Sequence, residues 1–160
     1  MTAFETSIPV RLTPTSKTFD REAVLPPHGD LIRFGAHGAV AEHYGTPDTA
    51  EPLPSTIDYL VASVAGCLIG TFGGSLRRAK VRVPPSALTA VATGSVASDE
   101  DNVLRLRRIT VDYTLELPEE HRAAAEEVHA AHAGRCPNAR SVAGAIEIVT
   151  TLDIVQPVAA

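Results

Sequence analysis

Apolar and polar residues alternate along several stretches of the chain, and this period of two predicts β-strands. The clearest case is Val103 to Leu117, whose second half has apolar residues at Ile109, Val111, Tyr113, Leu115 and Leu117. Similar patterns predict further strands over Ile8–Leu12, Phe19–Leu25, Leu31 to about Tyr44, Leu88–Val96 and Ile146–Ile154. Within the clearest strand, Leu104 and Leu106 are in the opposite phase, which predicts a β-bulge at Arg107-Arg108.

A long uncharged stretch predicts a helix at the centre of the fold. Tyr59 to Leu76 carries no charge over 18 residues and contains four glycines. Ser55 and Asp58 have the spacing of a capping box at its start, and Pro84-Pro85 prevents its continuation. The stretch meets the lower length limit for a membrane span. Its many small residues instead favour close packing against protein, so we expect a buried central helix and no membrane insertion.

Two more helices are expected near the C-terminus, one from Pro118 to Gly134 and a short one from Cys136-Pro137. The element order is then βββ-α-ββ-αα-β, an α+β fold over a single domain, residues 1–160, with mainly antiparallel sheet around the central helix. One sheet covers one side of a helix that is apolar on nearly all sides. We therefore expect a second copy to cover the rest, in an obligate homodimer with an interface above roughly 2,000 Å².

Composition narrows the possible partners. The chain has 160 residues, of which 44% are hydrophobic and 21% charged, as in a globular domain. Its net charge of −5 and the absence of a basic block argue against nucleic acid and anionic membranes. An aromatic share of 4% and the absence of Trp argue against stacking platforms for bases. The first ten residues have no basic and apolar leader pattern, so we expect a cytoplasmic protein.

The two cysteines carry the candidate chemistry. Cys67 lies in the middle of the apolar helix and Cys136 at the start of a short one, 69 positions later, so they form no Cys-x-x-Cys motif. Two inert buried thiols are the simplest interpretation of composition alone. Cys136 nevertheless has a setting that lowers a thiol pKa, a helix start flanked by Arg135 and Arg140. Cys67 has no such setting, because the amides around it are bonded within the helix.

Three residues near the C-terminus have a spacing that can suggest zinc. His129, His132 and Cys136 stand at i, i+3 and i+7 and would share one face of a continuous helix. Gly134 and Pro137 break that helix between them, so we expect surface histidines and no metal site. The sequence also shows no nucleotide-binding loop, and we expect no bound organic cofactor.

The sequences around the two cysteines resemble the OsmC/Ohr family. Leu60-Val-Ala-Ser-Val-Ala-Gly-Cys67 is similar to the family's first-cysteine helix, and Cys136-Pro-Asn-Ala-Arg-Ser-Val142, followed by a strand, to its second-cysteine motif. The resemblance implies an OsmC-like fold of two interlocked subunits with the thiol sites between them. It also implies a cysteine-based peroxidase that reduces organic hydroperoxides: Cys67 attacks the peroxide, Cys136 resolves the product as a disulfide, and an external dithiol restores both thiols.

The resemblance also implies an activating arginine from the N-terminal strands. Arg21 is the best match and Arg33 the second. Peroxidase members typically place Asn-Pro-Glu at the start of the central helix, where this chain has Ser55-Thr56-Ile57. Asp58 stands nine positions before Cys67, on the opposite helix face and about 13 Å away along the axis. It is better explained as a helix-start acid, so the carboxylate that orients the arginine has another source, for example Glu42, or is missing.

Two functional interpretations remain open. Both cysteine motifs favour hydroperoxide reduction by Cys67 and Cys136. The missing Asn-Pro-Glu favours a non-peroxidase protein of the same fold that binds a small apolar molecule between subunits. His43, just before the loop that leads to the central helix, is either part of the thiol site or an ordinary strand histidine.

Overall fold

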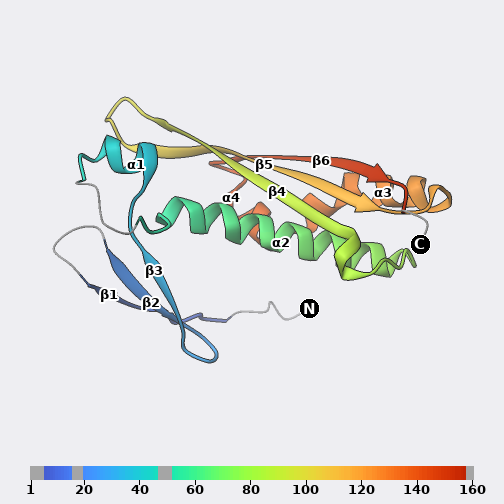
Figure 1. The fold of residues 1–160 in the computed structure, drawn as a ribbon, viewed down its shortest axis with the longest axis horizontal. Coiled ribbons are helices and arrows are strands. Elements are labelled where there is room, and N and C mark those ends of the chain that lie inside the picture. Colours follow the sequence, from blue (N-terminus) through green and yellow to red (C-terminus); the bar gives the residue numbers. More distant parts are fainter. Residues whose placement is uncertain (1–5, 16–19, 47–51, 158–160) are drawn as a thin grey trace. The chain divides into compact units, whose positions relative to one another are not determined.

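The computed structural model describes residues 6–15, 20–46 and 52–157 and confirms a mixed α+β fold with two three-stranded sheets (Figure 1). The chain divides into two compact units, Met1–Tyr59 and Leu60–Ala160. The boundary passes through the first turn of the long helix, so the helix start belongs to the first unit and both cysteines to the second.

The first unit contains an antiparallel sheet of β1 (Arg11–Pro14), β2 (Arg21–Leu25) and β3 (Asp30–Phe34) in that order. Strand β1 begins later than the alternation at Ile8 predicts, and Phe19, the expected start of the second strand, lies outside the described residues.

The expected strand from Leu31 to Tyr44 is wrong beyond Phe34. Helix α1 (Gly38–His43) takes its place, and its first residue, Gly38, has φ +52, which breaks the extended conformation. The Ala41 N–H then donates to the His37 carbonyl and the Tyr44 N–H to the Val40 carbonyl, as in a helical turn. His43 is therefore a helix-end residue, and its ring packs edge-on against Tyr44 at a centroid distance of 4.9 Å.

The second unit contains β4 (Leu88–Ser98), β5 (Leu104–Glu116) and β6 (Glu147–Val155), with β5 in the middle. Strand β4 is antiparallel to β5, whereas β6 is parallel to it. The strand pairs of the described residues are thus mainly antiparallel, as expected, with β5–β6 as the exception. A parallel neighbour requires a long crossover. Helices α3 (Arg122–His132) and α4 (Pro137–Val142) provide it.

The bulge predicted on β5 is confirmed. Ser95 pairs with Arg108 and Val96 with Leu106, so Arg107 has no partner across the ladder. The extra residue shifts the phase of the alternation. Beyond it every second side chain of β5 is buried, as the sequence pattern predicts: Ile109, Val111, Tyr113 and Leu115.

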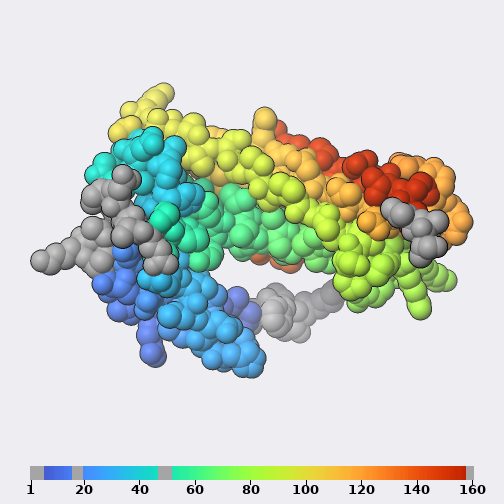
Figure 2. Space-filling view, in the orientation of Figure 1, coloured from blue at the N-terminus to red at the C-terminus, as the bar shows by residue number. Residues whose placement is uncertain are grey.

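Helix α2 (Thr56–Arg78) lies across one face of the second unit's sheet, with β4 running over it in the space-filling view (Figure 2). Val64, Leu68, Phe72 and Leu76 recur every four residues and are buried against the sheet. By length and apolarity α2 could cross a membrane. This buried row instead makes it a core helix of the second unit.

The other side of α2 is open. Leu60 is 38% exposed, and Gly66 and Gly70 are exposed, with nothing within 4 Å of where a β-carbon would stand. One sheet covers one face of α2, as expected for a single chain, and the second copy expected to cover the other face stays a prediction.

Candidate active site

The two cysteines lie beside each other where α4 meets α2. The Cys136 thiol is within hydrogen-bonding reach of the Cys67 thiol and of the Thr71 hydroxyl, one helical turn further along α2. Both thiols are free. Cys136 is completely buried, whereas Cys67 is half-buried. One thiol of the pair can therefore meet a reagent from solvent, and the other is placed to react with the first.

Asn138 holds the start of α4 against α2. Its side-chain amide donates to the carbonyl oxygen and to the hydroxyl oxygen of Ser63, each at 3.0 Å. Ser63 precedes Cys67 by about one helical turn, and Asn138 follows Cys136 by two residues. Pro137 occupies the first position of α4, where its missing N–H costs no hydrogen bond. Asn138 is part of the second-cysteine motif, but the sequence alone indicates no role for it.

The sequence prediction of a lowered thiol pKa at Cys136 is wrong. Burial raises the pKa of Cys136, and the neighbouring Cys67 raises it further. The backbone amide of Ala139 and the Thr71 hydroxyl act in the opposite direction without outweighing burial. Arg135 and Arg140 are exposed and contribute nothing to the shift. At rest Cys136 is therefore a protonated thiol.

Four aromatic and imidazole rings form a cluster in the second unit. Phe72, Tyr113, His129 and His132 pack with centroid distances between 5.0 and 5.7 Å. The Tyr113 hydroxyl lies 3.1 Å from Nε2 of His132, and both residues are almost completely buried. Burial also raises the pKa of Tyr113, and its electrostatic interaction with Cys136 raises it further. Tyr113 therefore stays protonated at neutral pH.

The expectation of surface histidines is wrong at this cluster. His132 is completely buried and His129 half-buried, and burial lowers the pKa of each. The predicted helix break is confirmed, since α3 ends at His132 and α4 begins only at Pro137. Ala125 is the other buried residue of α3. The two imidazole rings pack against Phe72 and Tyr113, a role that the spacing alone does not reveal.

The capping box predicted at the start of α2 is confirmed. The backbone N–H and the hydroxyl of Ser55 both donate to Asp58, at 2.7 and 2.6 Å, and the Asp58 N–H donates back to the Ser55 hydroxyl at 3.3 Å. His37, which sequence reasoning missed, lies 2.9 Å from the same carboxylate. Partial burial alone would raise the pKa of Asp58, but the hydrogen bonds from Ser55 and His37 hold it below its ordinary value. Asp58 is thus the helix-start acid that the sequence indicates.

Arg21 and Arg33 lie on opposite faces of the first unit's sheet. The register places Arg21 directly opposite Phe34, on the same face as the buried Ala23. Arg33 lies on the other face, where its guanidinium is 3.9 Å from the Glu22 carboxylate. Glu42 is exposed on α1, and no ion pair joins it to Arg21 within the described ranges. Arg21 is the arginine of the two that faces the apolar side of its sheet.

A hollow of about 620 Å³ follows the C-terminal half of α2. Ile69, Val81 and Leu88 give it apolar walls, and Gly70 and Gly73 leave the helix backbone open to it. Gly70 follows Cys67 by three residues, about 4.5 Å along the helix axis. Its size is within the range of small-molecule pockets.

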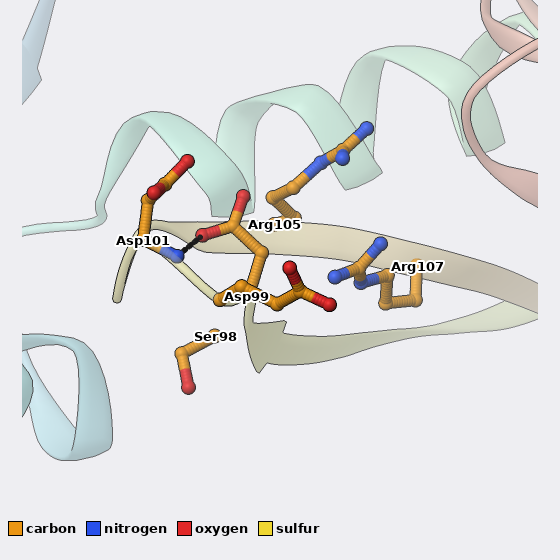
Figure 3. A pocket seen from close by; sticks show the side chains of 6 residues that line it. Ser98, Asp99, Asp101, Arg105 and Arg107 are labelled. Atoms are coloured by element: carbon orange, nitrogen blue, oxygen red, sulfur yellow. Dashed lines mark hydrogen bonds between the residues drawn. The ribbon is translucent and has the colours of Figure 1, made fainter.

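A second hollow, of about 580 Å³, lies at the β4–β5 turn (Figure 3). Its carboxylates shape the turn: Asp99 accepts the backbone N–H groups of Asp101 at 3.1 Å and Val103 at 2.9 Å. Arg105 and Arg107 extend beside them from β5. Neither cysteine lines this hollow, so it contributes nothing to the thiol pair.

Solved structures share this fold. An OsmC-like protein from Mycoplasma pneumoniae has a TM-score of 0.73 at 15% identity, over 95% of this chain and 99% of that chain. The organic hydroperoxide resistance protein OhrB of Bacillus subtilis has a TM-score of 0.67 at 16% identity, over 91% and 98%. An organic hydroperoxide resistance protein OsmC from Legionella pneumophila has a TM-score of 0.69 at 10% identity, over 94% and 99%.

The amino-acid sequence was also compared with curated proteins and with protein families. No curated protein matches the chain closely enough to count as a relative. Residues 48–151, more than half of the chain and including both cysteines, match the family described as OsmC-like protein. The resemblance seen in the two cysteine motifs is thereby confirmed, and the chain belongs to the OsmC-like family.

Proposed function

We propose that this protein reduces organic hydroperoxides with Cys67 as the attacking thiol and Cys136 as the resolving thiol. The observation that carries the proposal is the meeting of a half-buried and a fully buried free thiol within hydrogen-bonding reach. Two proteins of similar fold bear names that denote organic hydroperoxide resistance. The raised pKa of Cys136 supports this division of roles, because a protonated, buried thiol is a poor first nucleophile.

The chemistry balances with these two residues and an external reductant. The Cys67 thiolate attacks the peroxide, so that an S–O bond forms and the O–O bond breaks, releasing an alcohol and leaving a sulfenic acid. Cys136 then displaces hydroxide from that sulfur and forms the disulfide. An external dithiol reduces the disulfide by exchange. A reducing cytoplasm, the compartment expected from the sequence, supplies such dithiols.

Arg21 is our proposed activator of Cys67. It lies on the apolar face of its sheet and makes no ion pair within the described residues, whereas Arg33 is engaged with Glu22. A guanidinium without a carboxylate partner is free to stabilise a thiolate. Asp58 takes no part in this role, because its carboxylate is bonded to Ser55 and His37.

We further propose that the protein is a homodimer. The open side of α2 exposes Leu60 beside bare glycine backbone, and the first unit exposes Ile8, Leu12 and Leu31 by more than half of their surface. Apolar surface of this extent favours association. A second copy is the occupant expected from the sequence.

A second candidate function is the binding of a small apolar molecule, which the hollow along α2 favours. Its walls are mainly apolar, while Arg77, Lys80 and Arg82 line it as well, so it suits an apolar ligand that carries a negative charge. On this alternative the thiols do not turn over, and the protein acts by sequestering its ligand.

Peroxide consumption by cysteine variants separates the two candidates. Reduced protein is mixed with cumene hydroperoxide and dithiothreitol, and loss of peroxide is followed over time. The proposal predicts multiple turnovers for the parent and none for Cys67→Ser. Cys136→Ser consumes the first equivalent and leaves a sulfenic acid that dimedone traps on Cys67. Peroxide loss no faster than with free cysteine would favour the binding protein.

A further inference from the structure

The hollow along the C-terminal half of α2 has an apolar part that can hold a hydrocarbon chain. Its apolar walls come from Ile69 on the helix and from Val81 and Leu88 in the segment that turns back into β4 (Figure 1). The Leu88 side chain lies 3.6 Å from where a Gly73 β-carbon would stand, so it closes the hollow there. At Gly70 the helix backbone is open, because a β-carbon would meet nothing within 4 Å.

Three cationic side chains line the same hollow and stand close together in the sequence. They are Arg77, Lys80 and Arg82. No acidic residue of the described part of the chain lines this hollow. Among the described residues, no salt bridge joins any of the three cations to a carboxylate. The chain as a whole has a net charge of −5, so this end of α2 is a local region of positive charge.

The end of a helix accounts for only part of this charge. Cations in the last helical turn are stabilised by the helix dipole, which explains Arg77 and its neighbour Arg78. Arg78 does not line the hollow, and its guanidinium donates to the Ser75 hydroxyl at 2.9 Å. Arg82 comes after the helix has ended and the chain has turned, beyond the range of the dipole. Its charge therefore needs another explanation.

Lys80 has a backbone conformation that favours glycine. Its φ is +64, in the left-handed region. The Lys80 N–H donates to the Arg77 carbonyl and the Val81 N–H to the Leu76 carbonyl, the two hydrogen bonds of a Schellman motif. Glycine is the usual residue at this position, because a β-carbon is strained there. A lysine that places its charge at the hollow in spite of this strain points to a functional role.

We propose that this hollow binds a single-chain amphiphile whose head group is a phosphate monoester. The head group lies against Arg77, Lys80 and Arg82, and the apolar chain lies along α2. A phosphate monoester carries about 1.5 to 2 negative charges at neutral pH, so it matches three cations better than a carboxylate does. The proposal rests on the second candidate function, to which it adds a head group and an anchoring residue, and it requires no reaction of either cysteine.

Binding of decyl phosphate to the reduced protein, followed by isothermal titration calorimetry without peroxide, tests the ligand. Decanoate has a head group of lower charge, decanol has none, and inorganic phosphate lacks the chain. We expect saturable binding of decyl phosphate, about tenfold or more tighter than that of each comparison ligand. Decanoate or inorganic phosphate bound as tightly as decyl phosphate would overturn the proposed amphiphile.

The variant Lys80→Gly separates ligand binding from folding, because it removes the strain together with the charge. We expect its melting temperature to rise by about 2–4 °C and its affinity for decyl phosphate to fall about tenfold or more. Arg82→Gln should weaken binding by a similar factor without raising the melting temperature. Arg78→Gln is the matched control, since it removes a charge from the same helix end but not from the hollow, and binding should stay within about twofold.

The remaining outcomes also decide. Equal affinity of the parent, Lys80→Gly and Arg82→Gln overturns this site, although an apolar ligand could still bind elsewhere. Absence of saturable binding by the parent overturns it as well, and is expected if a second copy fills the hollow. A parent that binds decyl phosphate but does not consume cumene hydroperoxide retains this site, whereas the proposed peroxidase function of Cys67 and Cys136 then fails.

Discussion

The side-chain amide of Asn138 donates to two oxygen atoms of Ser63, the backbone carbonyl and the hydroxyl, each at 3.0 Å. This pair joins the first turn of α4 to the middle of α2. Ser63 lies about one helical turn from Cys67 and Asn138 two residues from Cys136, so we expect this contact to hold the two sulfurs close together.

Replacing Asn138 by Ala is expected to lower the unfolding free energy by about 1–2 kcal/mol, because two hydrogen bonds are lost. It also slows formation of the Cys67–Cys136 disulfide, measured by alkylating the remaining thiols after mild oxidation. Ser141→Ala is the control, since its hydroxyl bonds to Pro137 within α4. Equal disulfide rates in both variants would show that the bond to Ser63 does not position Cys136.

The cap of α2 gives a prediction about stability. Ser55→Ala removes the hydroxyl that both accepts from the Asp58 N–H and donates to its carboxylate. We expect a loss of about 1 kcal/mol in urea denaturation. Ser95→Ala, at an exposed position of β4, should change stability by less than about 0.5 kcal/mol. A Ser55 variant as stable as the Ser95 variant contradicts the cap.

The buried imidazoles predict sensitivity to acid. The pKa values of His129 and His132 are lowered in the folded state by burial, so the unfolded chain binds protons more readily. Stability is therefore complete above the ordinary histidine pKa of about 6.5 and falls as the pH drops below it. The lowered pKa of Asp58 adds a second loss at lower pH, below about 4. Urea midpoints between pH 8 and 5 measure the first effect, and His132→Asn should flatten it.

The substitution Gly66→Ala tests the homodimer, because it should stabilise a monomer but destabilise a dimer. A β-carbon there meets nothing within 4 Å in one chain, so Gly66→Ala should stabilise an isolated chain by up to about 1 kcal/mol through helix propensity. If a second copy packs on this face, the added methyl destabilises the assembly instead. Sedimentation and thermal melts at several concentrations separate these cases. A stable monomer at micromolar concentration, made more stable by Gly66→Ala, rules out the dimer.

Activation of Cys67 by Arg21 is tested by comparing Arg21→Ala with Arg33→Ala. Arg21→Ala should slow the reaction of Cys67 with iodoacetamide and with cumene hydroperoxide by about tenfold, if its charge stabilises the thiolate. Arg33→Ala removes a charge that Glu22 already engages, and should leave both rates within about twofold. Equal effects of the two changes would assign the loss to net charge and not to a specific contact.

Local patterns predicted those parts of the fold that depend on local chemistry. The alternation in β5, the bulge at Arg107 and the capping box at Ser55 all follow from neighbours within a few residues. The segment after Phe34 was mistaken for a strand because alternation over a few residues does not distinguish a strand from a short helix after a glycine.

The site depended on contacts that the sequence does not display. The two cysteine motifs identified the thiols, but the raised pKa of Cys136 follows from burial by elements far away in sequence. His132 was expected at the surface because Gly134 and Pro137 break the helix before Cys136. It lies instead against Tyr113, a residue 19 positions earlier on another element. Burial is a property of the packed chain, so it could not be deduced from the helix start alone.

The oxidation product of the thiol pair shows whether Cys67 and Cys136 react as proposed. Fully reduced protein receives one equivalent of cumene hydroperoxide, is alkylated at once, and is analysed by mass spectrometry after digestion. We expect one cumyl alcohol per chain and a Cys67–Cys136 disulfide with the loss of two hydrogens. Cys67 and Cys136 both recovered as alkylated thiols, with the peroxide intact, would contradict it.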